Sequence, residues 1–252
     1  MFIEEVLNID NMVFKPQTEL KKPEYDKIKI WEDGWERIQV APPPANNSTQ
    51  TLDDIKKIQN ELERATETVK QQYLNCDEDS SYYIKKYMED NDLEYDNDNI
   101  EFMEKQCSPV IRHFKNFFNR PRPYQIADKL GMKFDPYVTP TAQTPSYPSG
   151  HAVQPRVVAH YYAEKYPEHS EGLYRGAHIC GWGRVQAGLH YPSDYTAGIQ
   201  IADDLMGFLK EGELSEDAPV NSTGSGIAMP PTMRKKRKQD KRFFELWTRK
   251  PK

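Results

Sequence analysis

Beyond residue 50, apolar side chains return every three or four positions over long stretches, which is the period of an amphipathic α-helix. The first stretch is marked by Leu52, Ile55, Ile58, Leu62, Ala65, Val69 and Tyr73. This spacing predicts a helix over 51–73 with Thr51 as its N-cap, because a hydroxyl accepts a hydrogen bond from the free N–H groups of a first turn. A shorter helix is expected at 81–90.

The next periodic stretch starts at Asp98 or Asn99. Its apolar positions are Ile100, Met103, Cys107, Val110, Ile111, Phe114, Phe117 and Phe118. Pro109 lies inside the stretch and is expected to kink or split the helix, because proline lacks the N–H that an interior helical position needs. The helix should stop at the sequence NRPRPY, where two prolines stand close together.

Residues 124–148 are rich in proline and threonine and predict a long loop. Three more helical patterns follow, at 150–166, 170–189 and 192–210, whereas the alternating pattern of strands is scarce. We therefore expect an all-α fold, with a helical bundle over 51–210. Residues 1–50 are expected to form an irregular N-terminal arm that ends in a proline-rich spacer. Residues 211–252 should be a flexible linker and a basic tail, disordered or loosely docked.

The composition suits one main domain with extensions, since 37% of the 252 residues are apolar and a chain of this length can bury a sizeable core. No run approaches the roughly 20 apolar residues that span a bilayer. The N-terminus has early acids and no basic region before an apolar block, so it is a poor secretory signal. The three cysteines are widely spaced and odd in number, which argues against a disulfide framework or a clustered zinc site. These features favour a soluble, cytoplasmic protein.

Charge is distributed unevenly along the chain. Residues 221–252 contain ten Lys and Arg against two acids and contribute +8, so the net charge of −5 leaves −13 on the first 220 residues. The basic cluster at 234–242 could contact an acidic partner, either nucleic acid or an anionic membrane surface. A solubilising tail, or one docked on the acidic body, is equally consistent with the composition. The oligomeric state cannot be read from the sequence.

Two short segments place charged or small polar residues beside turns. In KNFFNRPRP, Lys115 lies seven residues before Arg122, and the prolines turn the arginine out of the helix toward the end of the lysine. In PSGH, at 148–151, Ser149 and Gly150 begin a predicted helix. Their hydroxyl and backbone N–H groups can cap that helix or hold an anion. One tetrapeptide does not decide between these roles.

A third segment, GRVQAGLHYPSDYTAG, contains Arg184, His190 and Asp194. Pro192 suits the first position of the last helix, which places Asp194 in its first turn. The ring of His190 can then donate a hydrogen bond to that carboxylate, which fixes the tautomer and makes the other ring nitrogen more basic. Taken singly, these residues could equally be a surface arginine, a packed histidine and a capping aspartate.

Together, the three segments supply three cations, a Ser-Gly turn and two histidines. Lysine and arginine donate to phosphate oxygens, arginine through a planar fork. His151, His190 and Asp194 are also metal-ligand types. Three nearby cations would oppose a divalent metal, however, and they attract an anion.

The segments resemble the signature K-x6-RP, PSGH and SR-x5-H-x3-D of the type 2 phosphatidic acid phosphatase and vanadium haloperoxidase superfamily. Residues 115–123, 148–151 and 184–194 match this signature in order. One position departs from it, because Gly183 stands where the family often has serine. That change removes a hydroxyl but no charged group. Residues 1–50 and the basic tail lie outside the resemblance.

The resemblance implies a metal-independent phosphatase that hydrolyses a phosphomonoester through a phosphohistidine, with no cofactor. The phosphate-binding residues that it implies, here called the anion cradle, are Lys115, Arg122, Ser149, Gly150 and Arg184. His190, oriented by Asp194, would attack phosphorus. His151 would protonate the leaving alcohol and then activate water.

Two alternatives remain open at this point. A vanadate-dependent haloperoxidase would use the same cradle, with His190 as the vanadium ligand. A non-catalytic phosphate-binding or interaction protein is the other, although the intact histidines and Asp194 weigh against it. The lack of apolar spans makes the chain similar to the soluble acid-phosphatase branch of the family and favours a small phosphorylated substrate. The remaining histidines match no motif and are expected in packing or surface positions: His113, His160, His169 and His178.

Overall fold

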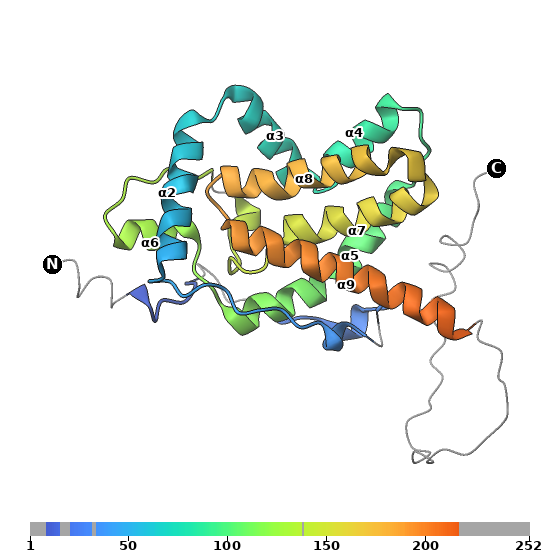
Figure 1. Ribbon diagram of the computed structural model, residues 1–252, viewed down its shortest axis with the longest axis horizontal. Coiled ribbons are helices and arrows are strands. Elements are labelled where there is room, and N and C mark those ends of the chain that lie inside the picture. The colour runs from blue at the N-terminus through green and yellow to red at the C-terminus, as the bar shows by residue number, and fades with distance from the viewer. Residues whose placement is uncertain (1–8, 16–20, 32–33, 138, 217–252) are drawn as a thin grey trace, which may run out of the picture.

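The computed structural model describes residues 9–15, 21–31, 34–137 and 139–216, and its elements are helices (Figure 1). The α-helices are α2 (Thr49–Arg64), α3 (Glu67–Glu78), α4 (Tyr82–Asp90), α5 (Asn97–Phe118), α6 (Pro123–Lys129), α7 (Gly150–Lys165), α8 (Ser170–Gln186) and α9 (Pro192–Glu216). Short 3-10 helices lie at Tyr25–Lys27, Trp35–Arg37, Pro140–Ala142 and Pro167–His169. The described residues contain no β-strand, so the predicted all-α fold is confirmed for them.

The predicted helix at 51–73 is in fact two helices, α2 and α3, which are separated at Thr66. The hydroxyl of Thr66 accepts a hydrogen bond from the N–H of Val69 and caps α3. A side chain that competes for backbone N–H groups thus begins a new helix at this point. The cap of α2 is Ser48, whose side chain accepts from the N–H of Thr51, so the predicted capping role of Thr51 is wrong.

α5 continues through Pro109, and the predicted split at this residue is wrong. The neighbouring Cys107 and Val110 are fully buried in the main core, and such packing offsets the helical hydrogen bond that proline cannot donate. The carboxylate of Asp96 caps the start of the helix. Asn119 ends the helix in the left-handed conformation, which asparagine tolerates better than most residues.

The predicted loop at 124–148 begins with a further helix, α6. Pro123 occupies its first position, where the missing N–H has no helical partner in any case and the fixed φ suits a helix. The side chain of Gln125 accepts a hydrogen bond from the backbone N–H of Arg122 at 2.9 Å. The prolines of NRPRPY therefore end α5 and also start the next helix.

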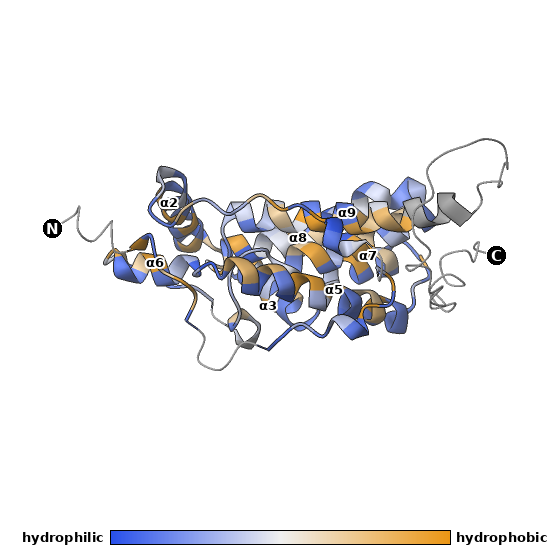
Figure 2. Ribbon diagram, turned by 90° about the horizontal axis from the view of Figure 1, so that it is seen from below, coloured by the Kyte–Doolittle hydropathy of each residue, from blue (hydrophilic) through white to orange (hydrophobic). Residues whose placement is uncertain are grey.

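α7 lies at the centre of the bundle and packs against α8, α9 and α5 (Figure 1). Its buried residues Val153, Val157 and Val158 belong to the main core, together with residues of α4, α5, α8 and α9. Figure 2 shows that apolar positions gather in this central part of the molecule. This packing fixes the positions of the helix ends, where the chemistry described below is located.

Described residues of the N-terminal arm pack against the helical bundle. Four of its side chains are buried in the main core: Ile28, Trp31, Trp35 and Ile38. Gln106 of α5 fastens the arm, because its side-chain oxygen accepts hydrogen bonds from the backbone N–H groups of Lys29 and Ile30. The arm therefore contributes to the stability of the bundle.

Cys76 of α3 and Cys180 of α8 form a disulfide, with 5.2 Å between their Cα atoms. The odd number and wide spacing of the cysteines argued against a disulfide framework, and the structure nevertheless pairs these two. They are 104 positions apart in the sequence, so no local spacing signals the bond, and only the packing of α3 on α8 brings the thiols together. Cys107 is a buried free thiol.

Of the helices in the described ranges, none combines the length and the apolar character needed to cross a bilayer. α9 extends to Glu216, into the segment predicted to be a linker. The rest of that segment and the basic cluster at 234–242 lie outside the described residues.

Candidate active site

The C-terminal ends of α5 and α8 and the N-terminal ends of α6, α7 and α9 meet around a cavity of about 210 Å³. The predicted site residues that line this cavity are Lys115, Arg122, Gly150, His151, Arg184 and His190. Its other lining residues are Ser108, Ile111, Arg112, Thr141, Thr144 and Gln154. Ser149 and Asp194 are fully buried beside lining residues. The structure thus brings together all the residues that the three motifs single out.

Arg122 is a fully buried cation in the wall of this cavity. Its Nε donates to the carbonyl oxygen of Thr144 at 2.9 Å, and its Nη1 donates to the carbonyl oxygen of Leu189 at 2.9 Å. Nη1 also lies 3.0 Å from Nε2 of His190. Burial, together with the positive charge of Arg184, lowers the pKa of Arg122 to about 10. The guanidinium therefore remains charged at neutral pH and can stabilise an anion.

The hydrogen bonds of His190 determine its tautomer. An arginine N–H can only donate, so Nε2 must accept from Arg122 and carries a lone pair. Nδ1 lies 3.1 Å from Oδ2 of Asp194 and therefore donates to it. Burial and the charge of Arg122 hold the pKa of His190 well below its usual range, although Asp194 acts in the opposite direction. The ring is therefore neutral at neutral pH, with its lone pair among the cations.

The carboxylate of Asp194 is held by four donors. Nη1 of Arg120 donates to Oδ1 at 2.7 Å. Oδ2 accepts from Nδ1 of His190, the hydroxyl of Ser146 and the N–H of Tyr191. Burial raises the pKa of this carboxyl, but the charge of Arg120 and the hydrogen bond from His190 outweigh burial and hold the pKa well below its usual range. Asp194 therefore stays ionised and orients the imidazole.

The sequence interpretation does not include two of these partners, Arg120 and Ser146. Arg120 belongs to the sequence RPRP, in which an Arg-Pro pair stands directly before the Arg-Pro pair of the motif. This repeated Arg-Pro pair is the sequence feature that could have identified Arg120 as a site residue. Ser146 lies in a proline-rich loop, and its N–H donates to the carbonyl oxygen of Arg120 at 2.9 Å. Nothing in the sequence distinguishes it from an ordinary turn serine.

Arg184 is paired with a carboxylate that matches no motif, Asp77 of α3. Nη2 of Arg184 donates to the hydroxyl of Thr141 at 2.8 Å, and the guanidinium lies 4.9 Å from the ring centroid of Tyr73. Burial raises the pKa of Asp77, but the hydrogen bond from Thr141 and the charge of Arg184 hold it below its usual value. Asp77 enters the site only because α3 packs on α8, and its charge partly neutralises Arg184.

Replacing Asp77 with asparagine is expected to tighten the binding of orthophosphate about tenfold, which corresponds to ~1.4 kcal/mol. The variant keeps a hydrogen-bond acceptor for Thr141 but removes a negative charge that competes with the anion for Arg184. Isothermal titration of orthophosphate measures the change. The matched control is Asp203→Asn, since Asp203 pairs with Arg156 away from the cavity. Weaker binding in the Asp77 variant would show that this carboxylate is needed to hold Arg184 in place.

Lys115 is buried in the last turn of α5. Its Nζ donates to the carbonyl oxygen of Pro145 and lies 3.5 Å from that of Ser146. Burial, followed by the charge of Arg122, lowers the pKa of Lys115 well below its usual range, and Asp194 acts in the opposite direction. A bound anion favours the charged ammonium, so binding of a phosphoryl group and protonation of this lysine support each other.

The start of α7 supplies neutral donors. The hydroxyl of Ser149 is buried and has no hydrogen-bond partner among the described residues. Since an unpaired buried hydroxyl is costly, this group and the N–H groups of the first turn are suited to a ligand oxygen. α9 approaches this turn so closely that a Cβ at Gly198 would lie 2.7 Å from the carbonyl oxygen of Ser149. At Gly183 an added Cβ meets no described atom within 4 Å, so there is open space where the family often has a serine side chain.

His151 lies in the first turn of α7 and lines the cavity. Burial and the positive charge of Arg184 hold the pKa of this ring well below its usual range, whereas Asp77 acts in the opposite direction. An anion bound among the cations would raise the pKa again, because it favours the protonated ring. His151 can therefore gain and lose a proton as the cavity fills and empties, which a general acid and base must do.

The remaining histidines do not line this cavity. Each has a contact elsewhere in the bundle: His113 with Tyr25, His160 with Asp203, His169 with Tyr87 and His178 with Tyr195. These contacts agree with the packing and surface positions expected for them.

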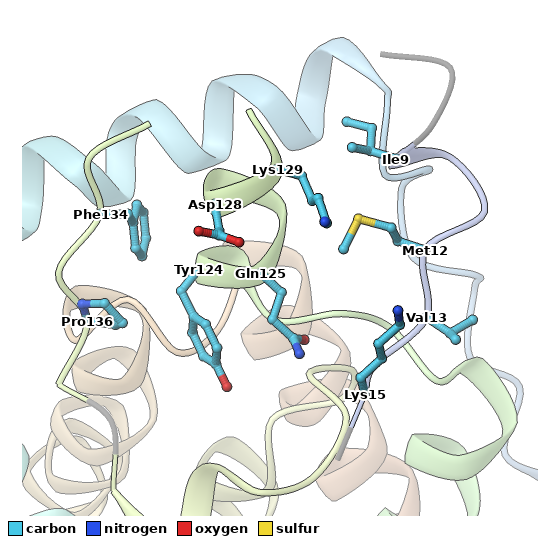
Figure 3. A pocket seen from close by; sticks show the side chains of 10 residues that line it. All are labelled: Ile9, Met12, Val13, Lys15, Tyr124, Gln125, Asp128, Lys129, Phe134 and Pro136. Atoms are coloured by element: carbon cyan, nitrogen blue, oxygen red, sulfur yellow. The ribbon is translucent and has the colours of Figure 1, made fainter. Parts of the chain in front are cut away.

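A larger cavity of about 680 Å³ lies beside α6 (Figure 3). Its lining residues come from the arm, from α6 and from the loop that follows: Ile9, Met12, Val13, Lys15, Tyr124, Gln125, Asp128, Lys129, Phe134 and Pro136. Arg122, the N-cap of α6, lines the smaller cavity, so this short helix contributes to both. None of the motif residues lines the larger cavity, and we therefore place the chemistry in the smaller one.

Comparison with known proteins agrees with this geometry. Residues 107–202 match the sequence profile of the PAP2 superfamily. No protein of curated function shows significant similarity to the chain. Among solved structures, it is similar to a bacterial vanadium-dependent iodoperoxidase, with a TM-score of 0.53, 15% identity, and coverage of 80% of this chain and 60% of that one. It is also similar to a transmembrane PAP2-type phosphatidylglycerolphosphate phosphatase from Bacillus subtilis, with a TM-score of 0.36, 18% identity, and coverage of 69% and 81%.

The matched region contains both the first and the last of the three motifs, and the motif residues surround one cavity. Residues 107–202, with the three motifs that they contain, are therefore similar to the PAP2 superfamily. The likeness to the iodoperoxidase shows a shared helical fold over 60% of that protein's length.

Proposed function

We propose that the protein is a metal-independent phosphatase that hydrolyses a small phosphomonoester through a phosphohistidine intermediate. The observation that carries the proposal is the state of His190. Its Nε2 lone pair lies beside Arg122 in a cavity lined by three cations, while its Nδ1–H is held by Asp194. A neutral nucleophile among fixed cations suits an attack on a phosphate dianion.

In the first step, Nε2 of His190 attacks phosphorus and the bond from phosphorus to the ester oxygen breaks. His151, protonated while the anion is bound, gives its proton to the leaving alkoxide. The anion cradle holds the phosphoryl oxygens as negative charge is redistributed in the transition state. The proton on Nδ1 of His190 stays in place, and the carboxylate of Asp194 stabilises the positive charge that develops on the ring.

In the second step, water attacks phosphorus from the side that the alcohol has left. His151, now neutral, takes a proton from this water, and the bond from phosphorus to Nε2 breaks. Orthophosphate is released and His190 returns to its neutral tautomer. The cavity of about 210 Å³ favours a phosphoryl group with a small organic part, because pockets for drug-sized ligands start at roughly 300 Å³.

We expect the purified protein to hydrolyse p-nitrophenyl phosphate at the same rate before and after treatment with EDTA. Orthovanadate should inhibit it, since vanadate adopts the five-coordinate geometry of the transition state and transition-state analogues bind 10²–10⁸-fold tighter than substrates. Release of p-nitrophenolate across pH 4–9 measures both effects. Loss of activity in EDTA that added metal restores would contradict the metal-independent mechanism.

The same cradle also suits vanadate as a cofactor. Three cations and the unpaired hydroxyl of Ser149 are groups that hold the oxygens of an oxoanion, and Nε2 of His190 would be the vanadium ligand. Bound vanadate would supply the activation of hydrogen peroxide for halide oxidation. Bromide oxidation after vanadate loading, in a protein that does not hydrolyse esters, would replace the phosphatase by a haloperoxidase. A folded protein that binds phosphate but has neither activity would be a phosphate-binding protein.

A further inference from the structure

Arg120 is a buried arginine that belongs to none of the three motifs and does not line the catalytic cavity. Its Nη1 donates to Oδ1 of Asp194 at 2.7 Å and to the hydroxyl of Ser193 at 2.8 Å. The guanidinium lies 3.8 Å from the ring centroid of Tyr191. Arg120 therefore contacts Ser193 and Asp194 in the first turn of α9 and Tyr191, the residue directly before the helix.

A carboxylate can rotate about the bond to its Cβ, and this rotation changes which oxygen faces the histidine. In the structure the two oxygens of Asp194 have different partners. Oδ1 accepts from Arg120, whereas Oδ2 accepts from His190, Ser146 and the N–H of Tyr191. Because both oxygens are engaged, the plane of the carboxylate is fixed, and with it the direction of the Nδ1–H bond of His190.

The same guanidinium reaches an element outside the matched family region. Its Nη2 lies 3.4 Å from the hydroxyl of Thr51 in α2, and that hydroxyl donates to the carbonyl oxygen of Ala45 at 2.8 Å. The carbonyl oxygen of Arg120 accepts the N–H of Ser146, directly before the PSGH turn. Arg120 thus joins the arm-proximal end of α2, the loop before α7 and the start of α9.

We propose that Arg120 is a positioning residue for the reaction, and that it aims Nε2 of His190 at phosphorus by fixing the carboxylate of Asp194. This inference rests on the proposed phosphatase function. The proposal distinguishes two roles among the cations at the site, binding of the anion and orientation of the nucleophile. Lys115, Arg122 and Arg184 bind the anion. Arg120 instead contacts Asp194, which orients the nucleophile, and it does not touch the substrate.

The test compares Arg120→Gln and Arg120→Lys with wild type, and Arg156→Gln is the matched control because Arg156 forms a surface pair with Asp203. We expect Arg120→Gln to lower kcat for p-nitrophenyl phosphate about 100-fold, the cost of a misplaced reacting group. KM and the inhibition constant of orthophosphate, which occupies the cradle without a bond to Nε2, should change less than about threefold. Arg120→Lys should recover part of kcat, and Arg156→Gln should match wild type.

A second readout reports on the histidine directly. In wild type, the Nδ1 proton of His190 should give a downfield proton NMR signal that is absent from His190→Ala. We expect this signal to move upfield or broaden in Arg120→Gln and to stay in place in Arg156→Gln. Thr51→Val removes the Nη2 contact together with the hydrogen bonds of the Thr51 hydroxyl to Ser48 and Ala45 but leaves Arg120 in place. It provides a milder variant if Arg120→Gln does not fold, and it should shift the signal in the same direction.

Several results would overturn the proposal. One is a folded Arg120→Gln variant with wild-type kcat and an unchanged signal. Another is an equal loss of kcat and of orthophosphate affinity, which would show that Arg120 maintains the anion cradle rather than the orientation of the nucleophile. If wild type hydrolyses no ester, the phosphatase function fails. The NMR signal and orthophosphate affinity then still decide whether Arg120 controls the orientation of His190.

Discussion

The His190→Ala variant is expected to lose hydrolysis of p-nitrophenyl phosphate by about 10⁴-fold or more, the scale seen when a nucleophile or its base is removed from an enzyme. Alanine leaves no atom that can bond to phosphorus, while the cations of the cradle remain in place. Orthophosphate should therefore still bind, within a few-fold of wild type. Steady-state kinetics measure the first effect and isothermal titration the second.

The intermediate itself provides a direct check. Wild type mixed with labelled substrate and quenched in alkali should carry a phosphoryl group that is stable to base and labile to acid, and His190→Ala should carry none. His178→Ala is the matched control, since His178 contacts Tyr195 outside the cavity and should keep both activity and label. A label that survives in His190→Ala would assign the nucleophile to another residue.

The His151→Ala variant is expected to lose turnover of alkyl phosphates by 10²–10⁴-fold, the usual contribution of a general acid. Turnover of p-nitrophenyl phosphate should fall much less in the first step, because p-nitrophenolate leaves readily without a proton. Rates measured across a series of esters with leaving groups of different basicity test this. A loss of kcat/KM, which reports the first step and not the attack of water, that is the same for every ester would show that His151 does not protonate the leaving group.

The pH dependence of wild-type activity should also reflect the protonation state of His151. In the free protein, burial and Arg184 hold the pKa of His151 low, so its protonated form is lost as pH rises and kcat/KM should fall from the acidic side of neutrality. A bound phosphoryl dianion raises that pKa, so kcat should persist to higher pH than kcat/KM. For alkyl phosphates this limb should be absent from His151→Ala. His169→Ala, away from the cavity, should keep it.

The sequence predicted the helices well where packing and local signals agree. α4, α7, α8 and the start of α9 lie close to their expected positions, because their apolar period and their turn residues point to the same boundaries. The prediction of helix boundaries failed where one residue is compatible with two different local structures. Thr66 could continue a helix or cap a new one, and Pro123 could end a helix or begin one. Pro109 is a different case, because the burial of its neighbours outweighs the cost of a proline inside a helix.

The residues of the site likewise fall into two groups, those that the sequence predicted and those that only the structure reveals. Every residue that the three motifs single out lies in or beside the cavity, because the motifs place these residues at or next to helix ends that meet there. Asp77 and Arg120 could not be assigned in the same way. Asp77 reaches Arg184 across 107 residues and Arg120 reaches Asp194 across 74, through the packing of helices that no local pattern specifies.

The sequence by itself thus determined the helical class, the three motifs and the types of charged and polar group that surround the cavity. The tertiary structure decided which charges and hydrogen-bond partners surround those groups. It alone places a carboxylate on Arg184, an arginine behind Asp194 and an N–H donor against Nε2 of His190. The reason is physical: residue type sets which charges and hydrogen bonds are possible, whereas distance and burial set their strength, and both depend on how distant helices pack.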